Sequence, residues 1–536
     1  MICNNFIKYC ISEGGEILPL LLDSQITKHT GICNPSVIID KDSKPLHILR
    51  NVNYALWNCD NENKFSTPYG DLAYITPSSD LNLRTTNFLV KYDTSTNEFI
   101  YNQINTSKFD TEPQWEFIGL EDARLVRWDN KLYITGVRRD NNNEGKGRFE
   151  LSQIDENGIE INRLTIESPE KDSYCEKNWM PIVDLPYHYI RWCNPLQIIK
   201  VNPNDGSVNI VVEREQFEPL TEVDGMQLRG SSQVLKIDNY YIAIIHMCHL
   251  GLNEKKQKTK AGYYHQFLIW NENWDLVKQS PLFKFANFGI EFTTGMAFND
   301  DKFYIPFALQ DSFSFLTIVP KKVIFDFIFN DNDFNHNKIL KIENIENNTL
   351  YKFFDNTCNS CNCYGLGLEY LKKGHYASSM VCFERACEYN GFESIEDMYN
   401  SMYMCGLSLY NLPETDEFEL NLWLKMINLC PQYSEGYYML SEYYYVRERY
   451  SEAFMHAKMA YDKNNFSVTS QYNITPIDVQ IQYIKCLYCT EEYQSCEGLL
   501  DNLLRVNISL TTKQLEVVNL LLDMINKNSN NKVRVL

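Results

Sequence analysis

The periodicity of the sequence changes at about residue 360, and this change restricts the chain to two differently built parts. From about residue 30 to 330, β-branched and aromatic runs alternate with tight turns. Beyond about residue 360, apolar residues recur at the spacing of an α-helix. A chain of 536 residues is also too long for one ordinary hydrophobic core. We therefore predict a multidomain protein, all-β and then all-α.

The first part shows strand, tight turn and strand in repeated succession. Asn, Asp and Gly tolerate the positive φ that hairpin turns require. Such residues separate apolar runs at Asp129-Asn130, Asn157-Gly158, Asp205-Gly206, Asp238-Asn239 and Asn299-Asp300-Asp301. Many short hairpins without a helical period indicate a sandwich, a barrel or a propeller. About 300 residues, at roughly four strands per blade, favour a five-bladed β-propeller.

The second part repeats itself. Six positions recur at an offset of 74 residues: Gly367, Tyr370, Tyr376, Ser379, Phe383 and Ala386 match Ser441, Tyr444, Tyr450, Ala453, Ala457 and Ala460. A third set follows after a further 43 residues, at Ile484, Leu487, Tyr493, Cys496, Leu500 and Leu503. These positions resemble the tetratricopeptide family, in which stacked helix pairs offer a concave face to a partner. An unrelated helical bundle is the alternative.

The domain limits follow from these patterns. We place the propeller at residues 1–328, an Asn-rich linker at 329–356 and the helical repeats at 357–536. No run of 18 apolar residues and no signal-peptide pattern occurs, so we expect a cytoplasmic protein without a membrane span. The net charge of -20 argues against general nucleic-acid binding, because that binding depends on Lys and Arg.

The segment Gly119-Leu120-Glu121-Asp122-Ala123-Arg124 is the sharpest local feature of the first part. Two adjacent carboxylates and an Arg stand at the start of a predicted strand. Because neighbouring side chains of a strand point to opposite faces, we expect Glu121 and Asp122 not to act as one pair. A simple salt bridge in a loop is the alternative explanation.

Other polar motifs accompany this segment in a fixed order along the chain. They are Asn34-Pro35-Ser36, Arg50-Asn51-Val52-Asn53-Tyr54, Asn87, Glu176-Lys177-Asn178-Trp179-Met180-Pro181, Arg229-Gly230-Ser231-Ser232, His246 with His249, and Gly295 leading to Asp311. Over roughly residues 30–320, this order resembles the five-bladed β-propellers of the inverting β-mannoside phosphorylase and mannosidase group and the mannosyltransferases similar to them.

The resemblance implies roles for individual residues. Asp122 would be the catalytic acid, which in this family reaches the glycosidic oxygen through a sugar hydroxyl. The sugar would be held by Asn34, Ser36, Arg50 and Asp311, with Asn53, Asn87, Glu121, Arg124 and Trp179 as further substrate-binding candidates. Phosphate would be bound by Lys177, Arg191, Arg229 and His249. Ala123 departs from the family, which usually has Pro there, and Pro would fix the backbone φ of the loop.

Alternatives remain for several of these residues. Trp179 is equally typical of a core residue, and Arg50 and Arg229 are also compatible with surface ion pairs. A hydrolase would need a carboxylate base for water. Asp184, Glu291 and Asp311 are the candidates for that base. A phosphorylase needs only cationic ligands for its anionic nucleophile. No cofactor and no metal site are predicted.

These observations lead to one functional prediction and one rival. We predict a glycosyltransferase or glycoside phosphorylase that acts on β-mannosides, with a sugar, a sugar phosphate or a nucleotide sugar as substrate. The helical repeats would bind a protein partner or a second copy of the chain. The rival is a non-catalytic scaffold, in which a degenerate sugar-binding propeller carries protein-interaction repeats.

Overall fold

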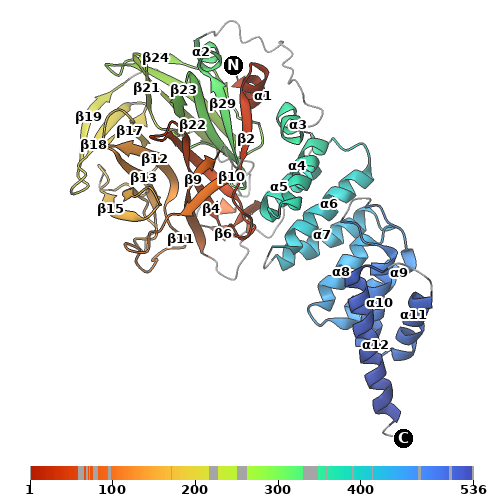
Figure 1. Ribbon diagram of the computed structural model, residues 1–536. Helices are drawn as coiled ribbons and strands as arrows, with labels where there is room; N and C mark the ends of the chain where they lie inside the picture. Colours follow the sequence, from red (N-terminus) through yellow and green to blue (C-terminus); the bar gives the residue numbers. More distant parts are fainter. Residues whose placement is uncertain are drawn as a thin grey trace. The chain divides into compact units, whose positions relative to one another are not determined.

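The computed structural model divides the chain into two compact units (Figure 1). The first unit comprises Met1–Cys382 with Leu412–Glu414, and the second comprises Phe383–Asn411 with Thr415–Leu536. The structure describes residues 2–57, 66–67, 70–71, 73–75, 82–93, 98–170, 172–215, 227–249, 262–329, 348–357, 359–388, 391–412, 415–468, 472–505 and 510–533. The first unit contains all the described strands.

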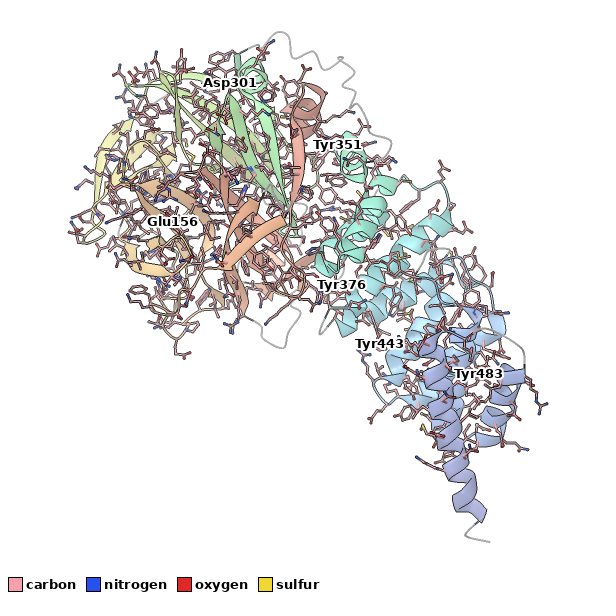
Figure 2. The ribbon with its side chains drawn as sticks, in the orientation of Figure 1. Glu156, Asp301, Tyr351, Tyr376, Tyr443 and Tyr483 are labelled. Carbon is pink, nitrogen blue, oxygen red and sulfur yellow. The ribbon has the colours of Figure 1, made fainter. Side chains whose placement is uncertain are left out.

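The predicted hairpin turns are confirmed. Asp129 and Asn130 have positive φ (49° and 59°) between β12 (Glu121–Trp128) and β13 (Lys131–Arg138). Asp301, labelled in Figure 2, has a φ of 59° in the turn from β27 (Ala297–Asn299) to β28 (Lys302–Leu309). These residue types adopt the left-handed region at lower cost than β-branched residues, which is why the strands end there.

The strands form a series of mainly antiparallel sheets in chain order. The first is ordered β10-β9-β4-β3 with β11 beside β9, and two four-stranded sheets follow, β12 to β15 and β16 to β19. A seven-stranded sheet then contains β20 to β25, and a last sheet is ordered β2-β29-β28-β26 with β27 beside β28. The remaining bounds in the first three sheets are β3 (Ile32–Ile39), β4 (Pro45–Val52), β9 (Leu83–Asp93), β10 (Glu98–Gln103), β11 (Phe117–Ile118), β14 (Arg148–Ile154), β15 (Glu160–Ile166), β16 (Met180–Pro181), β17 (His188–Cys193), β18 (Leu196–Val201) and β19 (Val208–Arg214).

The chain's first segments complete the last two sheets. In the seven-stranded sheet, β1 (Ile2–Cys3) pairs in parallel with β25 (Leu282–Phe283). In the last sheet, β2 (Glu16–Leu20) pairs antiparallel with β29 (Phe313–Pro320). The other strands there are β20 (Gln227–Gly230), β21 (Leu235–Ile237), β22 (Tyr240–His249), β23 (Gly262–Asn271), β24 (Leu276–Gln279) and β26 (Glu291–Phe292). Two further strand pairs form separate two-stranded sheets: β5 (Ala55–Trp57) with β8 (Ala73–Ile75), and β6 (Ser66–Thr67) with β7 (Gly70–Asp71).

Buried side chains join each sheet to the next, as in a β-propeller. Ile48 of the first sheet packs in one cluster with Leu125 of the second, and Trp128 of the second packs with Tyr189 of the third. A further cluster joins the third sheet to the seven-stranded sheet, and Leu49 of the first sheet packs with Leu316 of the last. Phe285, which follows β25, stacks on Phe307 of β28 with ring centroids 4.6 Å apart. The first unit is therefore propeller-like, with sheets packed around a closed ring.

Helices occupy part of the range that the sequence predicted as linker. Residues 330–347 lie outside the described residues, but residues 349–355 form α3 (Thr349–Asp355), and α2 (Lys321–Phe329) ends at the start of that range. The Asn348 side chain accepts a hydrogen bond from Tyr351 N and so caps α3. Phe354 packs edge-on against Phe315 of β29. A helix forms here because its buried aromatic face has a sheet to pack on.

The next helix, and the first part of the helix after it, also belong to the first unit. Tyr370 of α4 (Ser360–Lys372) lies against Phe313 of β29, with ring centroids 5.6 Å apart. In α5 (Tyr376–Glu388), Ser378 Oγ donates a 2.6 Å hydrogen bond to Ser312 O. The short α1 (Phe6–Ser12) buries Phe6 and Ile7 in the same unit. The domain limits of 328 and 357 stay a prediction, whereas the compact units divide at Cys382.

The second unit is helical. Its helices are α6 (Ile395–Tyr410), α7 (Asp416–Leu429), α8 (Glu435–Tyr445), α9 (Tyr450–Lys463), α10 (Pro476–Cys489), α11 (Tyr493–Arg505) and α12 (Thr512–Val533). α10 begins with a capping box, in which Thr475 and Asp478 satisfy each other's backbone N–H groups. Tyr443 and Tyr483, labelled in Figure 2, lie on α8 and α10.

Equivalent positions of the predicted repeat make equivalent contacts. Ser379 Oγ donates to Gly367 O (2.9 Å), Ser441 Oγ donates to Ala453 O (2.9 Å), and Cys496 Sγ donates to Ile484 O (3.6 Å). Each contact joins the two helices of one pair across the same interval of the repeat. The self-similarity of the sequence therefore reflects a repeated helix contact. Membership of the tetratricopeptide family stays a prediction.

Two glycines of the second unit give a matched stability test. A Cβ added at Gly406 of α6 would lie 2.0 Å from Cη2 of the buried Trp423, so Gly406→Ala should lower the free energy of unfolding by about 1–3 kcal/mol. A Cβ at Gly498 of α11 would meet nothing within 4 Å, so Gly498→Ala should raise it by up to about 1 kcal/mol. Chemical denaturation followed by the helical circular dichroism signal measures both. Equal stability of the two variants would contradict the α6–α7 contact.

No helix in the described parts of the chain combines the length and the apolar character that crossing a bilayer requires.

Candidate active site

Asp122 lies on a β-bulge at the start of β12. The pairing of β12 with β13 shifts register between Glu121 and Arg124, and Asp122 has a φ of 53°. Gly119, with a φ of 97°, comes close to Thr85, because an added Cβ would lie 2.6 Å from Thr85 O. A bulge inserts an extra residue and re-aims the side chains of its strand. This local geometry decides where the Asp122 carboxylate points.

A second bulge on β3 meets the first. The register of β3 with β4 shifts between Cys33 and Ser36, and Asn34 has a φ of 44°. Asn34 Nδ2 donates a 2.6 Å hydrogen bond to Asp122 Oδ1. Thr294 Oγ1, from the segment between β26 (Glu291–Phe292) and β27, donates to Asn34 O at 2.9 Å. Two left-handed residues from two sheets thus hold each other, an arrangement typical of strained functional sites.

Arg50 of β4 binds the two adjacent carboxylates. Its Nη1 donates to Asp122 Oδ1 at 2.9 Å, and its Nη2 lies 4.0 Å from Glu121 Oε2. Its Nε donates to Thr85 Oγ1 at 3.1 Å. The expectation that Glu121 and Asp122 point to opposite faces is therefore wrong, because the bulge and the positive φ at Asp122 interrupt the alternation of the strand.

The environment separates the pKa values of these two carboxyl groups. Burial acts to raise the pKa of Asp122, but Arg50, Lys177, Arg124 and the hydrogen bond from Asn34 outweigh it and lower this pKa. Burial raises the pKa of Glu121, and Asp122 adds to this effect while Arg50 opposes it. Asp122 is therefore the charged partner of Arg50 in the resting site.

Asp311 is a third carboxyl group beside Arg50. It has a φ of 47° in the turn between β28 and β29. Tyr54 Oη donates a 3.3 Å hydrogen bond to Asp311 Oδ2. Burial raises the pKa of Asp311, Arg50 opposes this, and the charge of Asp122 reinforces it. Asp311 thus lies close to both members of the Arg50–Asp122 pair.

Lys177 and Arg229 bring positive charge from two further sheets. Lys177 lies just before β16; it contributes to the lowered pKa of Asp122 and opposes the rise in the pKa of Glu121. Tyr263 of β23 lies near the same groups: burial raises its pKa most, Cys248, Asp311 and Asp122 add to this, and Arg229 of β20 opposes it. Residues from every large sheet, namely Asn34, Asp122, Lys177, Arg229 and Asp311, therefore lie around one centre.

Some predicted sugar-binding residues make hydrogen bonds to other parts of the first unit. Ser36 is fully buried, and its Oγ accepts from Leu125 N and Gln233 Nε2, both at 3.0 Å. Asn53 binds the backbone at Asn82 and Arg84. Asn87 Nδ2 donates to Leu120 O at 2.9 Å and so supports the segment that carries Asp122. Their substrate contacts stay a prediction.

Arg124 and Trp179 are both buried. Arg124 Nη1 donates to Asp122 O at 2.9 Å, and its Nε donates to Ser231 O at 2.7 Å, so this side chain joins β12 to the segment after β20. Trp179 is 1% exposed, stacks on Phe149 and donates from Nε1 to Glu176 Oε2. Trp179 is a core residue in this structure, and its stacked, buried indole has no free face for a sugar.

Among the predicted phosphate-binding residues, Arg191 binds other side chains of the protein. Arg191 donates from Nη2 and Nε to both carboxylate oxygens of Glu176 (2.8 and 3.1 Å), and its Nη1 contacts Glu170 and Gln197. These contacts occupy its guanidinium. Of the other predicted phosphate-binding residues, Lys177 acts to lower the pKa of Asp122, and Arg229 acts to lower the pKa of Tyr263. The backbone of His249 belongs to β22, but its side chain lies outside the described residues.

Sequence reasoning missed Tyr263 and Thr294, because neither belongs to a motif that singles it out among the 35 Tyr residues and the many hydroxyl side chains. Glu291, a candidate base, accepts hydrogen bonds from the backbone N–H groups of Phe285, Ala286 and Phe288. It therefore anchors a loop. Asp184 Oδ2 accepts from Lys236 N at 3.3 Å.

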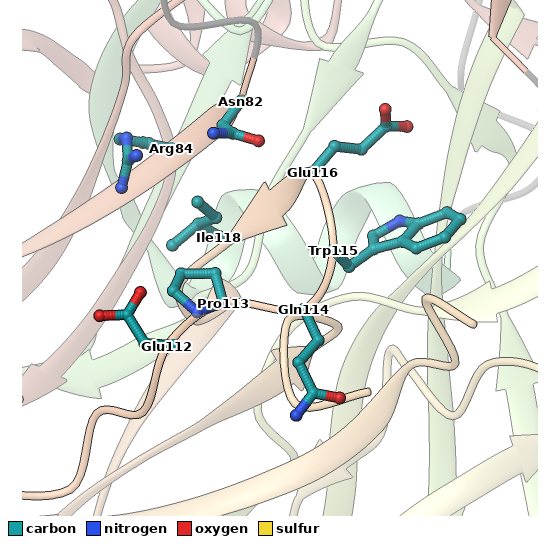
Figure 3. Close-up of a pocket in the computed structure, with 8 residues that line it drawn as sticks. All are labelled: Asn82, Arg84, Glu112, Pro113, Gln114, Trp115, Glu116 and Ile118. Carbon is teal, nitrogen blue, oxygen red and sulfur yellow. The ribbon is translucent and has the colours of Figure 1, made fainter. Parts of the chain in front are cut away.

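Two cavities adjoin the segment that leads to Asp122. One of about 460 Å³ is lined by Asn82, Arg84, Glu112, Pro113, Gln114, Trp115, Glu116 and Ile118. Figure 3 shows these side chains around the start of the strand that ends at Ile118. The other, of about 120 Å³, is lined by Gly119, Leu120, Asn87 and Arg138 among others.

Among the described residues, no group of three or more His, Cys, Asp or Glu side chains is placed to hold a metal ion.

The fold belongs to the propeller-like class of all-β units joined to a helical region. No protein-family model matches the chain, and no curated protein sequence matches it. Among solved structures, a β-1,2-mannobiose phosphorylase from Listeria innocua is 14% identical with a TM-score of 0.37, over 56% of this chain and 92% of its own. Two proteins from Leishmania mexicana are also similar. A GDP-Man-dependent mannosyltransferase is 10% identical (TM-score 0.34, 57% of this chain and 90% of its own), and a mannose phosphorylase is 11% identical (TM-score 0.31, 55% and 85%).

Proposed function

We propose that the propeller-like unit is a carbohydrate-active enzyme, a glycoside phosphorylase or glycosyltransferase that acts on β-mannosides. The observation that carries this proposal is the convergence of Asn34, Arg50, Asp122 and Asp311 with the cations Lys177 and Arg229. Carboxylates and amides suit the hydroxyl groups of a sugar ring. The cations suit a phosphate group beside it. The order of the sequence motifs supports the same assignment.

The reaction needs an acid for the departing oxygen and a nucleophile at the anomeric carbon. Two cations near the acid favour an anionic nucleophile or donor, such as phosphate, a sugar phosphate or a nucleotide sugar. Asp122 is charged in the resting site, however, because Arg50 and Asn34 both donate to its Oδ1. The role of Asp122 as the catalytic acid stays a prediction, in which its carboxylate takes up a proton before it gives one to the departing oxygen.

The wider assignment includes both units. The large sheets and their ring of core clusters support a five-bladed propeller, and the recurring helix contacts support tetratricopeptide-like repeats. We propose that the repeats bind a protein partner or a second copy of the chain, and that the protein acts in the cytoplasm.

An activity assay tests the proposal. The protein is incubated with mannose 1-phosphate or GDP-mannose and mannose acceptors, and separately with β-mannobiose and inorganic phosphate. We expect transfer or phosphorolysis products with one of these pairs. The rival, a sugar-binding module without activity, is favoured by the charged state of Asp122 at rest. Mannoside binding by calorimetry without turnover would establish the rival.

Arg229 should affect the anionic substrate more than the sugar. Arg229→Met removes a cation whose contact with phosphate is worth about 1.5–3 kcal/mol, so we expect the KM for phosphate or sugar phosphate to rise about 10- to 100-fold. Arg214→Met is the matched control, because Arg214 forms an exposed ion pair with Asp275. Steady-state kinetics with each substrate varied in turn measures both. An unchanged KM for the anionic substrate would remove Arg229 from this role.

A further inference from the structure

The turn that carries Asp311 is held by a helix of the C-terminal region. Ser378 Oγ of α5 donates a 2.6 Å hydrogen bond to the backbone O of Ser312, the residue after Asp311. Both serines are buried, at 3% and 1% exposed. Within the turn, Ser312 N donates to Leu309 O at 3.0 Å, and Ser312 Oγ donates to Gln310 O at 2.9 Å. The helix therefore adds a contact from outside to a turn that is already closed within itself.

The backbone of this turn needs such support. Asp311 and the residue before it have φ values of 47° and 52°. A left-handed residue other than Gly costs about 1–3 kcal/mol and persists only where its surroundings over-determine it. Gly31 packs directly against the turn, because an added Cβ would lie 2.5 Å from Ser312 Cα. Ser312 O accepts from Ile32 N at 3.3 Å as well as from Ser378 Oγ, and the bond from the helix is the shorter one.

The start of α5 also contacts the segment before β3. His29 Nδ1 donates to Gly374 O at 2.7 Å, and Ala377 N donates to His29 O at 3.0 Å. The ring of Tyr376, labelled in Figure 2, has its centroid 4.7 Å from that of His29. His29 is itself left-handed, with a φ of 64°. The start of α5 therefore contacts two strained stretches of backbone, the one at His29 and the turn at Asp311.

The segment before β3 also supports the strands of two other site residues. Asn51 Nδ2 donates to Thr30 Oγ1 at 2.9 Å and to Gly31 O at 2.8 Å. Asn51 directly follows Arg50 on β4, and the segment leads directly into β3, which carries Asn34. The two strands and the turn after β28 therefore meet at the place where α5 begins.

We propose that Ser378 is a positioning residue for the candidate site: its hydrogen bond to Ser312 fixes the Asp311 carboxylate for the hydroxyl groups of a mannoside. The affinity for the sugar then depends on α5 as well as on the strands. This inference rests on the proposed function, in which Asp311 binds the sugar, and deepens it by naming a helical residue that determines sugar affinity. Small displacements matter here, because a misplacement of about 1 Å can cost about 100-fold in activity.

Ser379 gives the matched control, because it is the neighbouring buried serine of the same helix. Its Oγ donates to Gly367 O at 2.9 Å, so this hydrogen bond joins α5 to α4 and does not reach the Asp311 turn. Ser378→Ala and Ser379→Ala each remove one buried hydroxyl group and one hydrogen bond. We expect a similar small loss of overall stability from both variants, and an effect on the Asp311 turn from Ser378→Ala alone.

Calorimetric binding to the full-length protein tests the proposal, with β-mannobiose and inorganic phosphate as separate probes. Ser378→Ala should weaken the affinity for β-mannobiose about 3- to 10-fold, the equivalent of one lost hydrogen bond. It should change the affinity for phosphate less than about twofold, and Ser379→Ala should leave both affinities at the wild-type values. An unchanged affinity for β-mannobiose in Ser378→Ala would overturn the proposal, as would equal losses for both probes or in both variants.

Amide hydrogen exchange examines the turn without any ligand. The N–H groups of Gln310 and Ser312 both donate to backbone carbonyls, and in Ser378→Ala they should exchange about 3- to 10-fold faster. Ser379→Ala should keep the wild-type rates there. Unchanged exchange in Ser378→Ala would overturn the proposal even if sugar affinity falls. Faster exchange in Ser378→Ala, when the wild-type protein binds no β-mannobiose, would uphold the contact that fixes the turn and contradict the proposed function instead.

Discussion

Replacing Asp122 by Asn should reduce turnover of a β-mannoside by about 10³-fold or more, because a central catalytic carboxylate typically contributes 10²- to 10⁴-fold or more to such a reaction. Asn keeps the size of the side chain and can still bind Asn34, but it removes the charge that pairs with Arg50 at 2.9 Å. Turnover is measured by product formation from the substrate pair that the wild-type protein uses.

Asp129→Asn is the matched control for this variant. Asp129 stands at the other end of the same strand, in the exposed turn after β12, where Asn tolerates the φ of 49° equally well. We expect wild-type turnover from it. If Asp122→Asn is as active as Asp129→Asn, Asp122 has no part in the chemistry, and the convergence of polar groups around it serves binding or structure alone.

Replacing Arg50 by Met should lower the free energy of unfolding of the first unit by about 3–5 kcal/mol. Removing one partner of a buried ion pair leaves an uncompensated buried charge. Here the side chains of Arg50 and Asp122 are only 7% and 14% exposed. Guanidinium denaturation followed by tryptophan fluorescence measures this, since all but one of the 8 Trp residues lie within residues 1–382.

The double variant Arg50→Met with Asp122→Asn separates charge from packing. It should recover part of the lost stability, because the unpaired carboxylate is then absent. Arg214→Met, which removes an exposed ion pair with Asp275, should change the free energy of unfolding by less than about 1 kcal/mol. A loss in Arg50→Met no larger than in Arg214→Met would show that the pair is not buried.

The difference in free energy of unfolding between the wild-type protein and Arg50→Met should depend on pH with a defined sign. The pKa of Asp122 is lowered in the folded protein, so its pair with Arg50 stabilises the fold at pH values above the ordinary Asp pKa. That contribution is lost as the pH falls through the lowered pKa of Asp122. The stability difference between the wild-type protein and Arg50→Met should therefore shrink in acid.

The division into a strand-rich part and a helical part could be predicted from local sequence patterns. Asn and Asp at the hairpin turns and the change to a helical period predicted the strand-rich part and the helical part. The pairing of β1 and β2 with strands about 300 residues later could not be predicted, because short strands carry no information about such distant partners. α3 was missed because its buried face becomes apparent only with Phe315 beside it.

Part of the candidate site could be predicted from the sequence. Motif order brought Asn34, Arg50, Asp122 and Asp311 into one prediction, and the structure places them together. Arg191 was predicted to bind phosphate, but its guanidinium binds Glu176. The sequence carries no pattern that predicts this pairing. The orientation of Glu121 depends on the bulge in β12 and on the positive φ of Asp122. Neither could be predicted, because the residues at these positions are also compatible with a regular strand.

The pairing of β2 with β29 also determines when the protein can mature during synthesis. A ribosome releases residues in order, so Glu16–Leu20 must wait until Phe313–Pro320 has emerged before the ring can close. Asn34, Arg50 and Asp122 are made early, yet Asp311 joins them only at that late moment. Until then the nascent chain exposes unpaired strand edges, which are templates for pairing with other chains.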